Sequence, residues 1–91
     1  MPKLKKGDTV FVACTVKPGP FSQERLITFQ TSEGAVSGFV QSELLKEVAG
    51  KWYVPAFVED IRGDAVKVRV AGSYFNTNGL ATIKRELALA A

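Results

Sequence analysis

Apolar and polar side chains alternate along most of this chain, a pattern typical of β-strands that have one buried face. In the clearest stretch, residues 65–71, three valines point to one side, and Lys67 and Arg69 point to the other. The same alternation predicts five further strands, over residues 9–16, 25–31, 35–40, 51–61 and 80–83. Short strands at this spacing favour an all-β fold, either a small barrel or a sandwich.

Glycine and proline mark the connections between the predicted strands, at residues 17–20, 32–34, 62–64 and 72–79. Pro55 lies inside the strand over residues 51–61 and predicts an edge position or a bulge at that point. Residues 41–47 lose the alternation and predict a single helical or 3₁₀ turn capped by Ser42. Residues 84–91 have good helix propensity and predict two helical turns.

The chain also carries a faint internal echo with a period of about 42 residues. Residues 7–16 correspond to residues 49–58, and residues 38–45 correspond to residues 81–88. The identities are few, because strands that alternate with the same period resemble one another by pattern alone. A true duplication and a shared alternation therefore explain the echo equally well.

The composition is that of a small, mildly basic domain. The chain has 91 residues, of which 46% are hydrophobic, and twelve Lys and Arg residues against nine Asp and Glu give a net charge of +3. We expect residues 1–6 to form a short basic arm and residues 7–91 to form one domain. No stretch is apolar and long enough for a signal peptide or a membrane span, so we expect a cytoplasmic protein without membrane contact.

Catalytic chemistry has little support in the sequence. The chain has no histidine, which excludes Ser-His-Asp and Cys-His nucleophile pairs and most zinc sites. Its single cysteine, Cys14, alternates in phase with the valines of the first strand, so we expect a buried and unreactive thiol. Residues 62–64 spell an adhesion tripeptide, Arg-Gly-Asp, which we interpret as a hairpin turn. We expect no enzyme activity, no cofactor and no metal.

Residues 38–45, Gly-Phe-Val-Gln-Ser-Glu-Leu-Leu, end a predicted strand and lead into the predicted turn. They resemble the Gly-aromatic-Val-x-Ser-x-Leu stretch that bacterial SH3 modules carry at the junction between a strand and a 3₁₀ turn. The resemblance covers roughly residues 8–60 and implies an SH3-like barrel of five or six strands. The chain departs from that family in its long connection at residues 17–24 and in the strand and helix predicted near its C-terminus.

The longest predicted strand has two apolar faces. If Val54, Ala56 and Val58 face the core, then Tyr53 and Phe57 share the opposite face, where an antiparallel sheet is usually polar. We therefore expect this second face to be covered. Three covers are open: the chain's own residues 87–89, a second copy of the chain, or a partner.

These patterns favour a non-catalytic interaction module that binds a protein or peptide through an aromatic surface patch. The residues expected to form it are Phe39, Tyr53, Phe57, Tyr74 and Phe75. Because Tyr74 and Phe75 are adjacent, we expect one ring to anchor inward and the other to face solvent. The alternative is a nucleic-acid-binding small β-barrel, in which basic residues neutralise phosphates beside the same aromatics. Those basic residues are Lys67, Arg69, Lys84 and Arg85.

Overall fold

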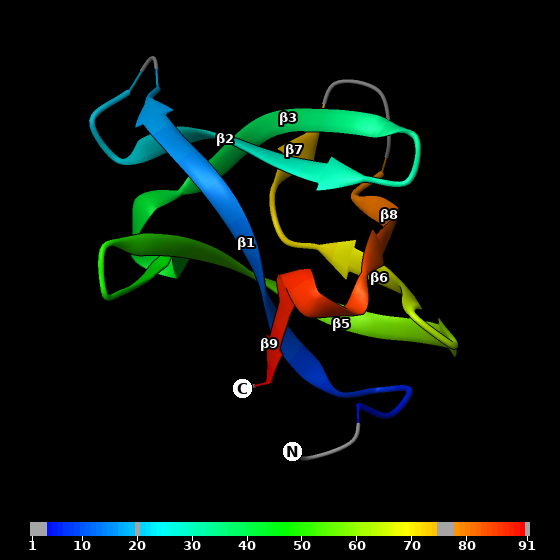
Figure 1. Cartoon of the computed structure of the whole chain (residues 1–91). Coiled ribbons are helices and arrows are strands. Elements are labelled where there is room, and N and C mark those ends of the chain that lie inside the picture. Colours follow the sequence, from blue (N-terminus) through cyan, green and yellow to red (C-terminus); the bar gives the residue numbers. More distant parts are fainter. Residues whose placement is uncertain (1–3, 20, 75–77, 91) are drawn as a thin grey trace.

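The chain folds into one curled antiparallel sheet with two short 3₁₀ turns (Figure 1), seen in a computed structural model that describes residues 4–19, 21–74 and 78–90. The strands are β1 (Thr9–Pro18), β2 (Glu24–Thr31), β3 (Gly34–Gln41), β4 (Lys46–Val48), β5 (Lys51–Arg62), β6 (Ala65–Val70), β7 (Ser73–Tyr74), β8 (Leu80–Lys84) and β9 (Ala88–Ala90). The turns are η1 (Ser42–Leu44) and η2 (Arg85–Leu87). The sheet runs in the order β7-β3-β2-β1-β5-β6-β8, with β4 also paired to β5 and β9 also paired to β1. It curls into a half-barrel, which is compatible with a small β-barrel.

The predicted all-β class is confirmed, but the described residues form nine strands rather than five or six. The three unexpected strands, β4, β7 and β9, are each only two or three residues long. The helix predicted over residues 84–91 is wrong. A single 3₁₀ turn, η2, leads into β9, because pairing with β1 outweighs the helix propensity of the leucines and alanines.

The valines predicted to point inward form the core. Val66, Val68 and Val70 are at most 3% exposed, and Val54 and Val58 are fully buried. Phe29 and Ile27 of β2 and Ile83 of β8 complete the same cluster. Cys14 packs against this core from the edge and is half-buried, so the expected full burial of its thiol is corrected to a partial one.

Two local expectations about turns and caps differ from the structure. The residue that caps η1 is Gln41, and no side chain makes the cap, so Ser42 does not act as predicted. The turn is instead closed by the Leu45 backbone N–H, which donates to the Ser42 carbonyl at 3.2 Å. Of the predicted basic arm, residues 1–3 lie outside the described residues, and Leu4 packs against the core.

Pro55 ends a hydrogen-bonded ladder without forming a bulge. On one side it pairs with Phe11 of β1, and on the other it accepts a 3.0 Å bond from the Ala71 backbone N–H. Proline has no N–H to donate in return, so the pairing of β5 with β6 stops one residue away, at Ala56 and Val70. The register shift in β5 lies between Val58 and Asp60 instead.

The strand pairing shows that the internal echo is structural. Val12 of β1 pairs with Val54 of β5, one period later in the sequence, so the two first strands of the halves pair with each other around this point. Tyr53 of β5 pairs with Lys46 of β4. Phe11, which corresponds to Tyr53, pairs with Leu89 of β9, which corresponds to Lys46. Each half therefore gives its last strand to the first strand of the other half.

The same two-fold relation holds around the 3₁₀ turns. At the start of η1, the Ser42 N–H donates to the Gln23 carbonyl at 2.8 Å. At the start of η2, the Arg85 N–H donates to the Asp64 carbonyl at 2.7 Å. These bonds fix each turn to the hairpin of its own half. The pseudo-two-fold relation places β4 and β9 at equivalent edges, and Figure 1 shows β9 beside the first part of β1.

Candidate functional site

The outward side of β1, β5 and β9 carries a continuous set of apolar side chains. Residues directly opposite each other in an antiparallel pair share a face, so the register identifies this set. Its members are Phe11 and Ala13 of β1, Tyr53, Pro55 and Phe57 of β5, and Leu89 of β9. We call this set the apolar face. Phe57 is 48% exposed and Leu89 is 41% exposed, while the other four members are half-buried.

Of the three covers left open by the sequence, the intramolecular one does not form among the described residues. Leu87 and Ala88 pack against the core, on the opposite side of the sheet. Leu89 lies beside Phe11 and points outward with it. The C-terminal segment therefore widens the apolar face by one side chain and leaves Phe57 open to solvent.

A shallow hollow of about 410 Å³ adjoins Phe57. Its walls include Thr9, Pro55, Phe57, Arg69, Gly72 and Asn78. The hollow opens where the ladder between β5 and β6 ends at Pro55 and the chain turns away at Gly72, whose φ is +122°. The missing N–H of Pro55 thus determines both the end of β6 and the position of the hollow.

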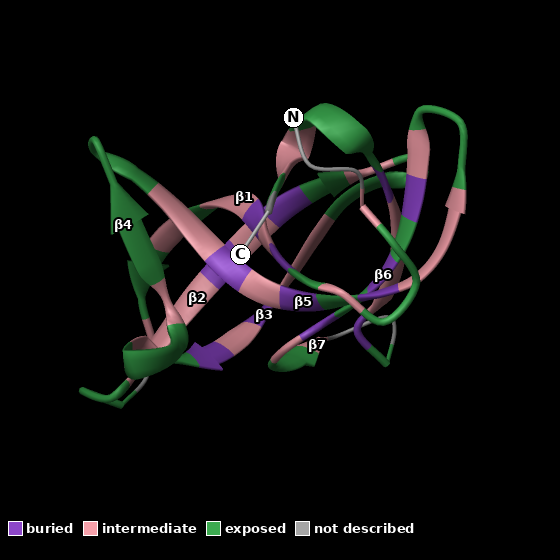
Figure 2. Cartoon of the chain, turned by 90° about the horizontal axis from the view of Figure 1, so that it is seen from below, coloured by how far each residue is buried: buried purple, intermediate pink, exposed green. Residues whose placement is uncertain are grey.

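Cationic side chains border the apolar face, and we call Lys46, Lys51 and Arg69 the cationic rim. Lys46 lies on β4, which is exposed along its whole length (Figure 2), and its Nζ is 4.9 Å from the centre of the Phe11 ring. Arg69 lies opposite Phe57, and its Nε donates to a Glu59 carboxylate oxygen at 3.0 Å. Lys51 has no ion-pair partner among the described residues.

The structure separates the predicted aromatic residues. Tyr53 and Phe57 lie together on the apolar face. Phe39 also points outward, as predicted, but it lies on β3 between Leu26 of β2 and Ser73 of β7. Tyr74 forms an edge-to-face pair with Phe29, with ring centres 5.6 Å apart.

Tyr74 is therefore the ring that anchors the loop over residues 72–79. Its hydroxyl donates to the Ala71 carbonyl at 2.5 Å, and burial raises the pKa of this hydroxyl above its usual value. Phe75, the other ring of the predicted pair, lies outside the described residues. Whether Phe75 faces solvent stays a prediction.

The predicted basic residues gather at the opposite end of β6. Lys67 pairs with Thr82 of β8, and Lys84 pairs with Ala65, so both lysines point outward from the same side of the sheet. Lys84 and Arg85 line a pocket of about 680 Å³ between the tips of two hairpins, together with Asp64 and Glu86. None of these three basic residues has an ion-pair partner among the described residues. Arg69 lies apart from them, beside Phe57.

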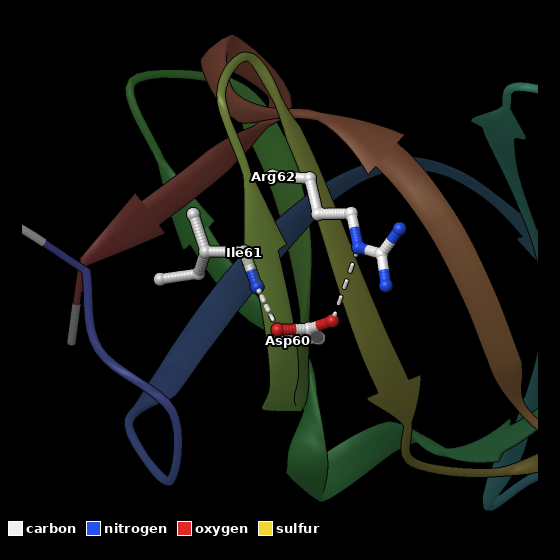
Figure 3. A network of polar contacts seen from close by, with 3 residues as sticks. All are labelled: Asp60, Ile61 and Arg62. Atoms are coloured by element: carbon white, nitrogen blue, oxygen red, sulfur yellow. Dashed lines mark hydrogen bonds and ion pairs between the residues drawn. The ribbon is translucent and has the colours of Figure 1, made fainter.

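Arg62, at the end of β5 near these basic residues, forms an ion pair with Asp60 of the same strand. Figure 3 shows the Asp60 carboxylate accepting bonds from the Ile61 backbone N–H at 2.9 Å and from Arg62 Nε at 3.4 Å. The Ile61 bond is the main reason that the pKa of Asp60 lies below its usual value, with the Arg62 guanidinium adding to it. The tripeptide of residues 62–64 forms the predicted hairpin turn, in which Gly63 adopts a φ of +59°.

Catalytic groups are sparse in the described part of the chain. Burial raises the pKa of the Cys14 thiol to about 11, which keeps it protonated and poorly nucleophilic near neutral pH. The described residues contain no cluster of three or more His, Cys, Asp or Glu side chains suited to a metal ion. They also contain no helix of the length and apolarity that crossing a membrane requires.

Sequence reasoning missed Leu89, Lys46 and Lys51 as members of this site. Leu89 falls in the helix predicted over residues 84–91. The alternation of Leu87, Ala88 and Leu89 covers only three residues, which is too short to predict a strand there. Lys46 falls in the turn predicted over residues 41–47, whereas the structure places it on the short edge strand β4. Lysine is common on edge strands, so its presence near Val48 is a signal that could have indicated one.

No protein family, no curated protein and no solved structure that we compared with this chain matches it.

Proposed function

We propose that this protein is a non-catalytic interaction module that binds a segment of a partner protein on the apolar face. The observation that carries the proposal is the exposure of Phe57 and Leu89 on one outward sheet surface with four more apolar neighbours. Outward positions of a one-sided antiparallel sheet are usually polar, and clustered apolar exposure marks interaction surfaces. The hollow beside Phe57 supports an anchoring role, because binding hot spots combine an aromatic residue with a pocket.

An SH3-like architecture is part of this proposal. It is supported by the order of elements in each half, in which three strands are followed by a 3₁₀ turn and a further short strand, if β7 is set aside as an insertion. In this interpretation the binding surface lies where the two halves pair, on the outward side of β1 and β5.

Substitution of Phe57 tests the proposal, with Phe21 as the matched control. Phe21 is 70% exposed but lies in the turn before β2, away from the apolar face. Peptides selected from a random library against the native protein should lose at least tenfold in affinity for Phe57→Ser and keep their affinity for Phe21→Ser. Equal binding by both variants would show that the apolar face is not the site.

Binding of single-stranded nucleic acid is a second candidate function. Its support is the group of Lys67, Lys84 and Arg85, which lack ion-pair partners among the described residues and lie at one end of the sheet. Phosphate contacts release counterions, so such binding weakens steeply with salt. An oligo(dT) titration at 50 and 200 mM salt, repeated with Lys84→Glu, measures this directly. Absence of binding at the lower salt concentration excludes it.

A further inference from the structure

Most of the charges around the apolar face are positive. Outward positions of β4 hold Lys46 and Val48, and the outward position at the start of β5 is Lys51. Arg69 lies directly opposite Phe57 on β6, and Glu59, two residues after Phe57 on β5, is bonded to Arg69. No outward position of β1, β4 or β9, nor of β5 up to Phe57, holds an aspartate or glutamate. The border of the apolar face is therefore mainly cationic, and its carboxylate, Glu59, is bonded to Arg69.

This border argues against a second copy of the chain as the occupant. An isologous contact between two copies would bring two sets of Lys46, Lys51 and Arg69 into one interface, against only the two Glu59 carboxylates. Like charges at an interface disfavour the complex, and the whole chain already carries a net charge of +3. A partner with carboxylates would meet complementary charge instead.

The hollow beside Phe57 adds geometry to this charge pattern. An apolar side chain entering it contacts Pro55 and Phe57, and Arg69 forms part of the same wall. Arg69 is half-exposed and is held by Glu59 through a single 3.0 Å bond, so its remaining donors are able to meet a second carboxylate. Lys46 and Lys51 lie at the other end of the face, beyond Tyr53.

We infer that the occupant of the apolar face is an acidic segment of a partner protein, in which apolar side chains are flanked by aspartates or glutamates. One apolar side chain fills the hollow beside Phe57, and carboxylates on either side of it meet Arg69 and the two lysines. This inference rests on the proposed function, because it names the partner chemistry of the same face.

The test is a selection from a phage-displayed library of random twelve-residue peptides against the native protein at low salt. We expect the enriched peptides to carry Asp or Glu next to apolar residues. Synthetic versions of these peptides should bind Lys51→Glu at least tenfold more weakly than the native protein. Lys84→Glu is the matched control, because it makes the same charge change on β8, and it should leave the affinity within twofold.

The outcomes separate this inference from the proposed function. Enriched peptides that depend on Phe57 but contain no acidic residues, or that bind Lys51→Glu as well as the native protein, overturn the inference alone. A selection that yields no peptide dependent on Phe57 overturns both. Oligo(dT) that displaces the selected peptides and that loses its affinity in Phe57→Ser also overturns the inference, since the face would then take a nucleic acid. Unchanged urea midpoints of both lysine variants would confirm that charge, and not folding, causes the difference.

Discussion

The two tyrosines of this chain form a natural pair for separating a structural ring from a binding ring. Tyr74 forms an edge-to-face ring pair with Phe29 at a centre distance of 5.6 Å and donates a hydrogen bond to the Ala71 carbonyl. Tyr53 lies on the apolar face, and its hydroxyl has no hydrogen-bond partner among the described residues. We therefore expect replacement of Tyr74 to destabilise the fold and replacement of Tyr53 to affect binding.

The structure sets the expected sizes. Tyr74→Phe removes one partly buried hydrogen bond, which costs about 0.5–1.5 kcal/mol of unfolding free energy. Tyr74→Ser also removes an edge-to-face ring pair worth about 0.5–1.5 kcal/mol, together with about 1–2 kcal/mol of apolar burial. The total for Tyr74→Ser is about 2–5 kcal/mol. Tyr53→Ser loses cross-strand contacts with Ala13 and Lys46 and should cost about 1 kcal/mol or less.

Urea unfolding followed by far-UV circular dichroism measures these differences. With a denaturant slope of about 1 kcal/mol per M for a domain of this size, Tyr74→Ser should lower the midpoint by about 2–5 M, and Tyr53→Ser by under about 1 M. If the two serine variants lose equal stability, or if Tyr74→Phe costs nothing, Tyr74 is not the anchor of its loop. In that case stability measurements would no longer distinguish Tyr74, as the structural ring, from Tyr53, as the binding ring.

Three further predictions concern the core, one close approach and the thiol. Val68→Ala should lower the free energy of unfolding by about 1–3 kcal/mol because the side chain is fully buried, whereas Lys67→Ala should lower it by under about 0.5 kcal/mol. Equal losses in urea unfolding would mean that the inward and outward positions of β6 are wrongly assigned. Gly38→Ala should lower the free energy of unfolding by about 1–3 kcal/mol, because a Cβ there would overlap the Tyr74 ring and the backbone of β7. A urea midpoint at or above the native one would contradict this close packing of Gly38 against β7. The pKa of Cys14 is raised from 9.0 to about 11, so the stability it contributes is complete below pH 9 and is lost as the pH rises towards 11. Cys14→Ala should reduce this alkaline loss in urea midpoints measured at pH 8 and pH 10.5, and rapid alkylation of the native thiol at pH 7.5 would contradict its burial.

Alternation predicted the parts of the fold in which one face is buried along a whole strand. The inward valines of β6 and the outward position of Phe39 both follow from a period of two, because a strand between core and solvent imposes it on every side chain. The same alternation places Tyr53 and Phe57 on one face, and this is the part of the candidate site that could be predicted from the sequence. Local pattern was enough at these positions.

Local pattern was not enough where a distant strand decides the structure. Residues 88–90 have a helical composition, and they are extended only because β1 offers them a partner. Leu89 was therefore missed as a member of the apolar face. Tyr74 and Phe75 are neighbours of similar character, so nothing local indicates which of them anchors the loop, and contact with Phe29 assigns that role to Tyr74.

The exchange of last strands between the halves has a consequence for the protein during its synthesis. The backbone of residues 10–12 is paired by β9, whose residues are made almost eighty positions later. Until residues 88–90 leave the ribosome, one edge of β1 stays open, and open strand edges recruit other chains. The nascent chain therefore passes through a long interval in which one edge of its first strand is unpaired, and that edge closes only when residues 88–90 emerge.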